Sequence, residues 1–197
     1  DAYRASFLNT VRTKSRKSLH IDAGLHRRIS SLVWAVGRGE VTVAGFVRQG
    51  SRIADVRTDH GYIPVYLAQT GRIASALAMD VRPGPLERAQ AHVRDYEERE
   101  RARRQDVWAV PIHLRLSDGL KELKPGEADT VIIAGMGGEL IIKILDEGRH
   151  VWDSVKQYVL SPQSDLDKVR RYLAAHGFAI EDEAMVKDCL LYTSPSP

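Results

Sequence analysis

From Ser51 onward, the sequence alternates between short apolar runs, typical of buried strands, and longer segments with the apolar spacing of helices. The apolar runs span residues 51–56, 74–81, 107–117, 128–136, 155–162 and 178–186. The helical segments span residues 62–71, 84–104, 138–148 and 164–177. This alternation predicts an α/β fold with a doubly wound, mostly parallel sheet and helices on both faces. We expect the sheet to be truncated near the sixth strand.

Two strands have features that predict their place in the sheet. Residues 128–136 (ADTVIIAGM) are β-branched and apolar on both faces, as expected of a central parallel strand. Pro111 predicts an edge position or a bulge for the third strand, because proline cannot donate to a strand ladder.

The two ends of the chain are less regular. Residues 26–36 (HRRISSLVWAV) predict a helix, and the glycine-rich stretch 37–45 (GRGEVTVAG) predicts a loop or a small hairpin. We expect three regions: a basic, partly irregular N-terminal arm and helix over 1–50, a cofactor-binding domain over 51–188, and a disordered Ser/Pro-containing tail over 189–197.

Charge and composition exclude several classes of protein. No apolar run approaches the roughly 18 residues that a membrane span needs, so we expect no membrane partner. The single Cys189 leaves no internal disulfide and no cysteine-based zinc site, which fits a reducing compartment and a cytoplasmic protein. The histidines lack the spacing of metal ligands, so we expect no metal.

The N-terminal arm is strongly basic. Residues 1–28 carry seven Lys/Arg against only Asp1 and Asp22, whereas the formal charge of the whole chain is +3. A basic arm suits a polyanion such as RNA, but it is equally typical of a solvated tail or of an organelle-targeting segment.

Four candidate site segments fall at the carboxyl ends of predicted strands, where open parallel sheets bind their ligands. They are the turn 55–61, Asp80, residues 117–119 (SDG) and residues 134–138 (AGMGG). Each alone also fits helix capping or tight-turn geometry. Because these strand ends share one edge of a parallel sheet, together they predict a binding site there.

Two kinds of cofactor compete for this edge. A dinucleotide fold needs G-x-G-x-x-G directly after the first strand, but the first turn offers only Gly61. The run GMGGEL follows the fourth strand and has Leu140 where the last glycine should be. S-adenosylmethionine, which has no pyrophosphate, needs a turn that admits its amino-acid end, an acid for the ribose and a polar group for the adenine. Asp55, Asp80 and Asp118 supply these in order. Methyl transfer is therefore favoured over the hydride transfer of an NAD-type oxidoreductase.

Five segments together resemble the bacterial tRNA (adenine-22-N1)-methyltransferase family. They are RIADVRTDHGYIPVYLA, AMDVRPGPLERAQAHV, LRLSDGL, ADTVIIAGMGGELIIKIL and YVLSPQSD. The similarity runs from about Arg52 to Asp188, with TDHGYIP and IAGMGG as its distinctive motifs. It implies a Rossmann-like class I fold and an enzyme that uses S-adenosylmethionine to methylate N1 of an adenine, adenine 22, in tRNA.

The resemblance also implies roles for individual residues. The reaction centre falls on Asp59, His60 and Tyr62. The implied cofactor contacts are Asp55, Arg57, Thr58, Gly61, Asp80 (at the ribose), Asp118 and Gly119 (at the adenine), Ala134, Gly135 and Met136. The implied substrate contacts, which include the floor beneath the target base, are Gly137, Gly138, Pro162 and Gln163.

Two features depart from the family. Arg57 stands where the family has glycine, and the family continues into a further strand and a helical C-terminal region. At a left-handed position, arginine would cost about 1 kcal/mol or more. Its guanidinium could pair with the cofactor carboxylate or with a tRNA phosphate instead. The substitution favours a weakened cofactor site, and a catalytically silent RNA-binding module that keeps the fold is the alternative function.

The chemistry of N1 methylation indicates what the site must supply. N1 of adenine already carries a lone pair, so the enzyme has to position the reactants and stabilise the positive charge on the ring. Asp59 is the predicted carboxylate for this, and His60 or Tyr62 would orient or stack the base. Each has a structural alternative: Asp59 as a helix cap, His60 as a loop histidine and Tyr62 as a core residue.

Overall fold

The structure, a computed structural model, describes residues 28–36, 40–103 and 109–187. Its strands are β1 (Arg28–Val36), β2 (Ser51–Val56), β3 (Ile73–Asp80), β4 (Ile112–Leu116), β5 (Thr130–Met136), β6 (Gln157–Pro162) and β7 (Phe178–Lys187). Its helices are α1 (Glu40–Phe46), α2 (Tyr62–Gln69), α3 (Pro83–Arg103), α4 (Gly138–Glu147) and α5 (Leu166–Ala175), with a short 3-10 turn at Arg149–Val151.

The strands form one seven-stranded sheet in the order β4-β3-β2-β5-β6-β1-β7. Every neighbouring pair is parallel. The chain moves outward from β2 to β3 and β4, and then returns to place β5 on the other side of β2. The direction of winding therefore reverses between β2 and β5, where an open α/β sheet leaves a crevice for ligands.

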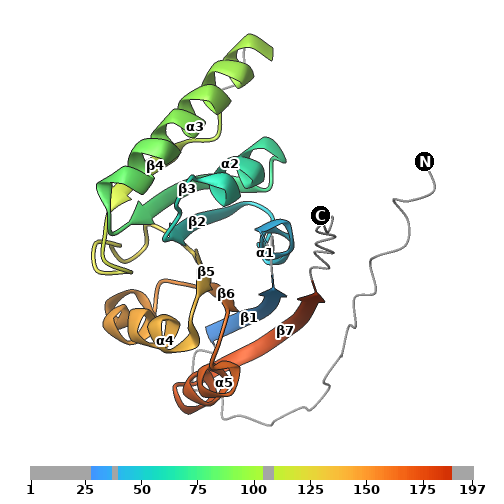
Figure 1. The fold of residues 1–197 in the computed structure, drawn as a ribbon, viewed down its shortest axis with the longest axis vertical. Coiled ribbons are helices and arrows are strands. Elements are labelled where there is room, and N and C mark those ends of the chain that lie inside the picture. The colour runs from blue at the N-terminus through green and yellow to red at the C-terminus, as the bar shows by residue number, and fades with distance from the viewer. Residues whose placement is uncertain (1–27, 37–39, 104–108, 188–197) are drawn as a thin grey trace, which may run out of the picture.

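Helices cover both faces of the sheet (Figure 1), which confirms the predicted doubly wound fold. α1, α2 and α3 lie on one side and α4 and α5 on the other, and α3 extends past the edge of the body. β4 is an edge strand, as Pro111 predicted, and Pro111 directly precedes it. None of the described helices is long and apolar enough to cross a membrane.

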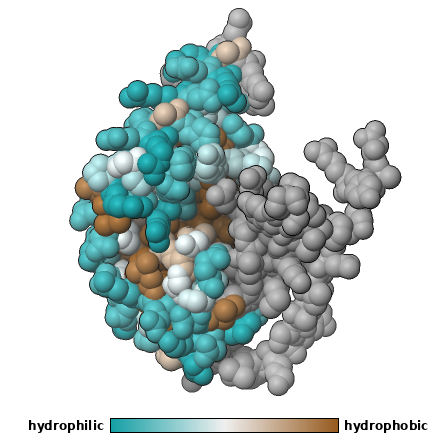
Figure 2. Space-filling view, viewed as in Figure 1, coloured by the Kyte–Doolittle hydropathy of each residue, from teal (hydrophilic) through white to brown (hydrophobic). Residues whose placement is uncertain are grey.

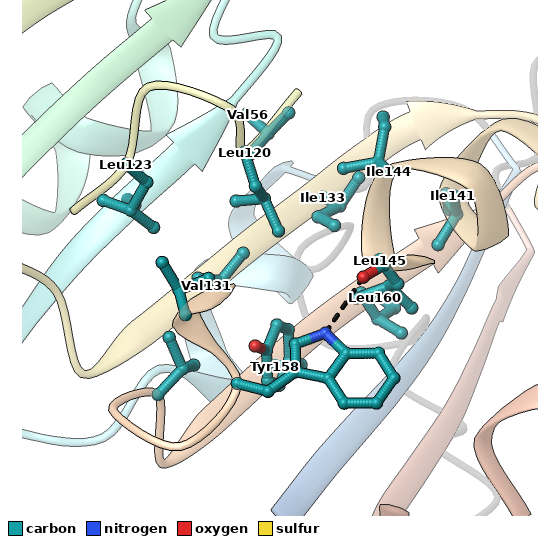
Figure 3. Packing of buried hydrophobic residues seen from close by; sticks show 14 of the residues in the cluster. Val56, Leu120, Leu123, Val131, Ile133, Ile141, Ile144, Leu145, Tyr158 and Leu160 are labelled. Carbon is teal, nitrogen blue, oxygen red and sulfur yellow. Dashed lines mark hydrogen bonds between the residues drawn. The ribbon is translucent and has the colours of Figure 1, made fainter. Parts of the chain in front are cut away.

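Alternation along the strands sends side chains into two separate cores. In β3, Ala76 and Ala78 face α2 and α3, whereas Leu77 and Met79 face the core beneath α4. The small alanines let the helices approach the sheet closely on their side. Figure 3 shows the other core, where Ile133 of β5 packs among the buried apolar side chains of α4.

Aromatic side chains close the far end of this second core. Trp152 donates a 2.9 Å hydrogen bond from its indole nitrogen to the carbonyl oxygen of Leu145 (dashed in Figure 3), which satisfies the one polar group of the buried ring. The ring of Phe178 meets those of Trp152 and Tyr158 edge to face, at centroid distances of 5.1 Å and 5.4 Å. These contacts attach the start of β7 to β6 and to the segment after the 3-10 turn, which Trp152 in turn bonds to α4.

The structure differs from the sequence expectation before Ser51. Residues 28–36, predicted as part of a helix, form β1. Residues 40–45 of the stretch 37–45, predicted as a loop or a small hairpin, belong to α1. A short apolar run does not distinguish strand from helix by itself. In the fold, the strand conformation of residues 28–36 is stabilised by pairing, because β1 lies between β6 and β7 and pairs with both of them. The sixth predicted strand is β7, and β1 separates it from β6.

The N-terminal segment thus contributes to the same sheet as the rest of the described chain. α1 buries Val43 and Ala44, and the residue after it, Val47, is buried in the same core, which they share with α2 and α3. The basic residues before Arg28 and the predicted tail 189–197 lie outside the described residues, so the arm and the tail stay predictions.

Candidate cofactor and substrate site

A cavity of about 340 Å³ opens at the carboxyl ends of β2, β3, β5 and β6, beside the point where the winding reverses. This volume is within the usual range of small-molecule sites. Its lining comprises Val43, Asp55, Val56, Arg57, Thr58, Asp59, Tyr62, Ile63, Asp80, Arg82, Ala134, Gly135, Ser161 and Gln163. The structure therefore brings together nine of the site residues predicted from the sequence, from four separate strand ends.

A buried pair of polar side chains lies at the end of β2. Thr58 donates a 2.7 Å hydrogen bond from Oγ1 to Oδ2 of Asp55, and both residues are buried. The backbone nitrogen of Thr58 also donates to the carbonyl oxygen of Met79 at 2.9 Å. These bonds connect the turn after β2 to the end of β2 and to the neighbouring strand β3. They therefore fix the position of Thr58, where the turn begins to line the cavity.

Asp80 ends β3 and is the most deeply buried acid of the cavity, with 1% of its surface exposed. Its Oδ1 accepts a 3.0 Å hydrogen bond from the backbone nitrogen of Arg82. Its Oδ2 is buried and has no hydrogen-bond partner among the residues that the structure describes. A buried acceptor without a donor costs free energy, about 1–3 kcal/mol, which a ligand hydroxyl can recover.

The turn between β2 and α2 has an unusual backbone. Arg57, Asp59 and Gly61 all have positive φ, at 62°, 49° and 72°. Glycine is the residue that tolerates this region without a steric cost, and aspartate tolerates it better than most. Arg57 thus has the left-handed conformation at the position where the family has glycine. It also lines the cavity.

Asp59 contacts two basic side chains, Arg88 and His60. Arg88 of α3 donates to its Oδ1 at 3.0 Å, and the Nδ1 atom of His60 lies 3.0 Å from its Oδ2. The hydrogen bond from Arg88 is the main cause that lowers the pKa of the Asp59 carboxyl below its ordinary value, and His60 lowers it further against an opposing effect of burial. The carboxylate is therefore ionised at neutral pH.

Aromatic rings gather beside this carboxylate. The Tyr62 ring stacks on His60 at a centroid distance of 5.3 Å and meets His92 of α3 edge to face at 4.7 Å. Tyr62 lines the cavity and is 47% exposed, so it is no core residue. The cap of α2 is Gly61, without a side-chain hydrogen bond, so Asp59 does not cap that helix either.

The ends of β5 and β6 form the other wall. Ala134 and Gly135 line the cavity, and the backbone of Gly135 is left-handed, with φ 72° and open space where a side chain would stand. Ser161, which is buried, and Gln163 follow from β6. The backbone nitrogen of Gln163 donates to the carbonyl oxygen of Met136 at 2.8 Å, which joins the two strand ends.

Several predicted site residues do not line the cavity: His60, Gly61, Asp118, Gly119, Met136, Gly137, Gly138 and Pro162. Asp118 is exposed and paired with Lys121, whose hydrogen bond lowers the pKa of the Asp118 carboxyl. A Cβ atom on Gly138 would lie 2.5 Å from the carbonyl oxygen of Ser164. In the structure, Gly138 therefore serves the close packing of α4 on the segment before α5, and not the cavity wall.

Five lining residues were not predicted: Val43, Val56, Ile63, Arg82 and Ser161. Ser161 could have been predicted from the sequence, because it lies at the end of a predicted strand. Val43 was not, since its helix was expected to be a loop. In the described ranges no three His, Cys, Asp or Glu residues gather into a set that could hold a metal ion.

Comparison with known proteins agrees with this geometry. The family described as Methyltransferase domain matches residues 41–193. The tRNA (adenine(22)-N(1))-methyltransferase of Bacillus subtilis is 31% identical over 147 residues, which cover 75% of this chain and 58% of that protein. The chain thus spans little more than half the length of that relative.

Two solved structures with cofactor or cofactor product superpose on the chain. Sp1610 of Streptococcus pneumoniae, in complex with S-adenosyl-L-methionine, is 30% identical with a TM-score of 0.61, covering 80% of this chain and 77% of Sp1610. M. capricolum TrmK, in complex with S-adenosyl-homocysteine, is 26% identical with a TM-score of 0.57, covering 72% and 58%. With a family match over most of its length and a cavity at the expected edge of the sheet, this chain belongs to the methyltransferase domain family.

Proposed function

We propose that the chain binds S-adenosylmethionine in this cavity and methylates N1 of an adenine, adenine 22, in tRNA. The buried Oδ2 of Asp80, which has no partner in the described part of the chain, carries the proposal, because a ribose hydroxyl is the kind of donor that this oxygen lacks. A tRNA substrate also makes the cytoplasm the expected place of action.

The residues around Asp80 fit the nucleoside part of this cofactor. Val81, the next residue along the chain, is 54% exposed, and so is Leu116, which pairs with Asp80 across the sheet. Exposed apolar side chains beside a ribose-binding acid offer a surface for the face of an adenine ring. Asp55 and Thr58 supply the polar end of the same cavity.

The remaining lining residues suit the transfer step. A bound cofactor would supply an electrophilic methyl group on its sulfonium centre. The bond from the lone pair on N1 of the target adenine to this methyl carbon would form as the carbon–sulfur bond breaks, with S-adenosylhomocysteine as the leaving group, so that no strong base is needed. Positive charge then develops on the adenine ring. The ionised Asp59 carboxylate at the cavity stabilises that charge. Because the pKa of Asp59 is lowered, its role is electrostatic and not that of a proton acceptor.

Tyr62 and Gln163 are the proposed contacts of the target base. Tyr62 presents an exposed ring on which an unstacked base can lie, as single-stranded RNA bases do on aromatic side chains. Gln163 lines the cavity from the end of β6, and its amide group can both donate and accept hydrogen bonds at the edge of a base.

The experiment combines binding with methyl transfer. S-adenosylhomocysteine is titrated into the chain by calorimetry, and methyl incorporation from labelled S-adenosylmethionine is measured on a tRNA transcript with adenine 22 and on one with guanine there. Binding together with methylation of the first transcript alone is expected. Binding without methylation of either would leave the silent RNA-binding alternative, and absence of binding in folded protein would overturn the proposal.

A further inference from the structure

One face of α3 contacts the turn that carries the proposed reaction centre. Arg88 donates to Asp59, Ala89 lies against Gly61, and Nδ1 of His92 lies 3.2 Å from the carbonyl oxygen of His60. A Cβ atom on Gly61 would come within 3.3 Å of the Cβ atom of Ala89, so helix and turn are already in close approach. Positions 88, 89 and 92 share one face of a helix, and α3 therefore acts as a support for this turn.

The Asp59 side chain depends on that support. Asp59 has a left-handed backbone, with φ 49°, and its side chain is 57% exposed. The turn is closed by a backbone hydrogen bond from Gly61 to Thr58 at 2.9 Å, which does not involve the side chain of Asp59. Within the turn, that side chain has only its contact with the neighbouring His60. Arg88 comes from a different element and bonds Oδ1, while His60 lies beside Oδ2, so each carboxylate oxygen keeps a further lone pair for a substrate.

We propose that Arg88 is a positioning residue for methyl transfer, which holds the Asp59 carboxylate at the cavity where charge develops on the target adenine. The inference rests on the proposed function, which it deepens. Arg88 itself does not line the cavity, so its effect on the reaction is exerted through Asp59.

A purely structural role does not account for this pair. The Arg88 and Asp59 side chains are 50% and 57% exposed, and ion pairs of such exposure contribute little to stability. Misplacement of a reacting or stabilising group by about 1 Å, in contrast, can lower the rate about a hundredfold. Loss of Arg88 should therefore reduce the rate far more than the stability.

The protonation of Asp59 gives a second, independent signature. The charged and titratable groups around its carboxylate are Arg88 from α3 and His60 from the same turn, with Arg57 on the cavity side and His92 behind His60. The hydrogen bond from Arg88 is the largest cause of the lowered pKa of Asp59. Without it, that pKa should rise toward its ordinary value.

The test compares Arg88→Met and Arg88→Lys with Arg99→Met. Arg99 pairs with Asp95 on α3 at 2.9 Å, with similar exposure, and serves as the matched control. The measurements are kcat and KM for tRNA methylation, calorimetric affinity for S-adenosylhomocysteine, Tm, and the Asp59 carboxyl titration followed by NMR without cofactor.

Arg88→Met should lower kcat about tenfold to a hundredfold, with unchanged Tm and cofactor affinity, and should shift the Asp59 titration to higher pH. Arg88→Lys should restore part of kcat, and Arg99→Met should match the wild type. Wild-type kcat in Arg88→Met, or an equal loss in Arg99→Met, overturns the inference alone. A wild-type chain without methyl transfer overturns the proposed function and this inference with it.

Discussion

The backbone nitrogen of Arg82 donates a 3.0 Å hydrogen bond to Oδ1 of Asp80, while Oδ2 of the same carboxylate has no partner among the described residues. One oxygen is thus fixed by the chain itself and the other is kept for a ligand. Because Asp80 is 1% exposed, water does not compete freely for this oxygen. The pair indicates a carboxylate that is oriented before any ligand arrives.

Asp80→Asn tests that orientation. The amide keeps the size of the side chain but removes the charged acceptor, and a hydrogen bond to a charged group contributes about 1.5–3 kcal/mol. Affinity for S-adenosylhomocysteine should therefore fall roughly tenfold to a hundredfold by calorimetry. The Tm should not fall by a comparable amount, since Oδ2 has no intramolecular partner to lose among the described residues. Unchanged affinity would remove Asp80 from the cofactor site.

Arg57→Gly should make the protein more stable. A left-handed conformation costs a non-glycine residue about 1–2 kcal/mol, and Arg57 has φ 62°. The greater entropy of glycine in the unfolded chain offsets part of this gain, about 0.5–1 kcal/mol. The net gain of up to about 1 kcal/mol corresponds to a rise in Tm of roughly 2–4 °C for a chain of this size.

The same variant should bind S-adenosylhomocysteine more tightly, because the arginine side chain leaves the cavity that Arg57 lines. Arg57→Ala is the matched control, since it removes the guanidinium but keeps a Cβ atom at positive φ. We expect the alanine variant to share the gain in affinity but not the gain in Tm. Weaker binding in both variants would mean that the guanidinium pairs with the cofactor carboxylate.

The sequence predicted most of the sheet because its signals are local. Alternating apolar runs and helical spacing located β2 to β7 and α2 to α5, with small differences at their ends. The run LVWAV near the start did not distinguish strand from helix, whereas in the fold β1 lies between β6 and β7 and pairs with both. That pairing joins residues more than one hundred positions apart in the chain.

The site, like the sheet, was predictable where the signal is local in the sequence. The rule that ligands bind beyond the carboxyl ends of parallel strands located Asp55, Asp80 and Gly135. It does not give the direction of a side chain, so it did not separate Asp118, which pairs with Lys121 outside the cavity lining, from the acids that line the cavity. The contact between Arg88 and Asp59 could not be predicted from the sequence, because only the fold brings α3 beside Asp59.

Gly138→Ala and Gly135→Ala should separate packing from ligand contact. A Cβ atom on Gly138 would lie 2.5 Å from the Ser164 carbonyl oxygen and 2.8 Å from Cγ2 of Val169. Backbone gives way poorly, so we expect a loss of about 1–3 kcal/mol in the free energy of unfolding. The folded fraction of the Gly138→Ala variant should keep the cofactor affinity of the wild type.

Gly135 has open space for a Cβ atom, but its φ is 72°. The substitution should cost about 1 kcal/mol of stability and, because Gly135 lines the cavity, should also weaken S-adenosylhomocysteine binding. Urea unfolding and calorimetry on both variants check the two effects. Loss of affinity in Gly138→Ala at full folding would instead restore a ligand role for Gly138.

An ion pair at the edge of the sheet should control stability in acid. Arg115 of β4 donates to both carboxylate oxygens of Glu127, at 2.6 Å and 2.9 Å. This pairing is the main cause that lowers the pKa of Glu127 to about 2, with help from the backbone nitrogen of Lys124. The carboxylate is protonated more readily in the unfolded chain, where its pKa is about 4.3.

A folded-state pKa below the unfolded value gives stability that is present above the unfolded pKa and lost as the pH falls toward the folded one. The contribution of Glu127 should therefore be complete above about pH 5 and should disappear between about pH 4.5 and pH 2. Glu127→Gln should lower the free energy of unfolding by about 1–2 kcal/mol at pH 7 and flatten its decline across that interval. Urea unfolding at a series of pH values measures both, with Glu98→Gln on the exposed face of α3 as control. A Glu127→Gln variant whose stability declines in acid as steeply as that of the wild type would show that other carboxylates dominate this interval.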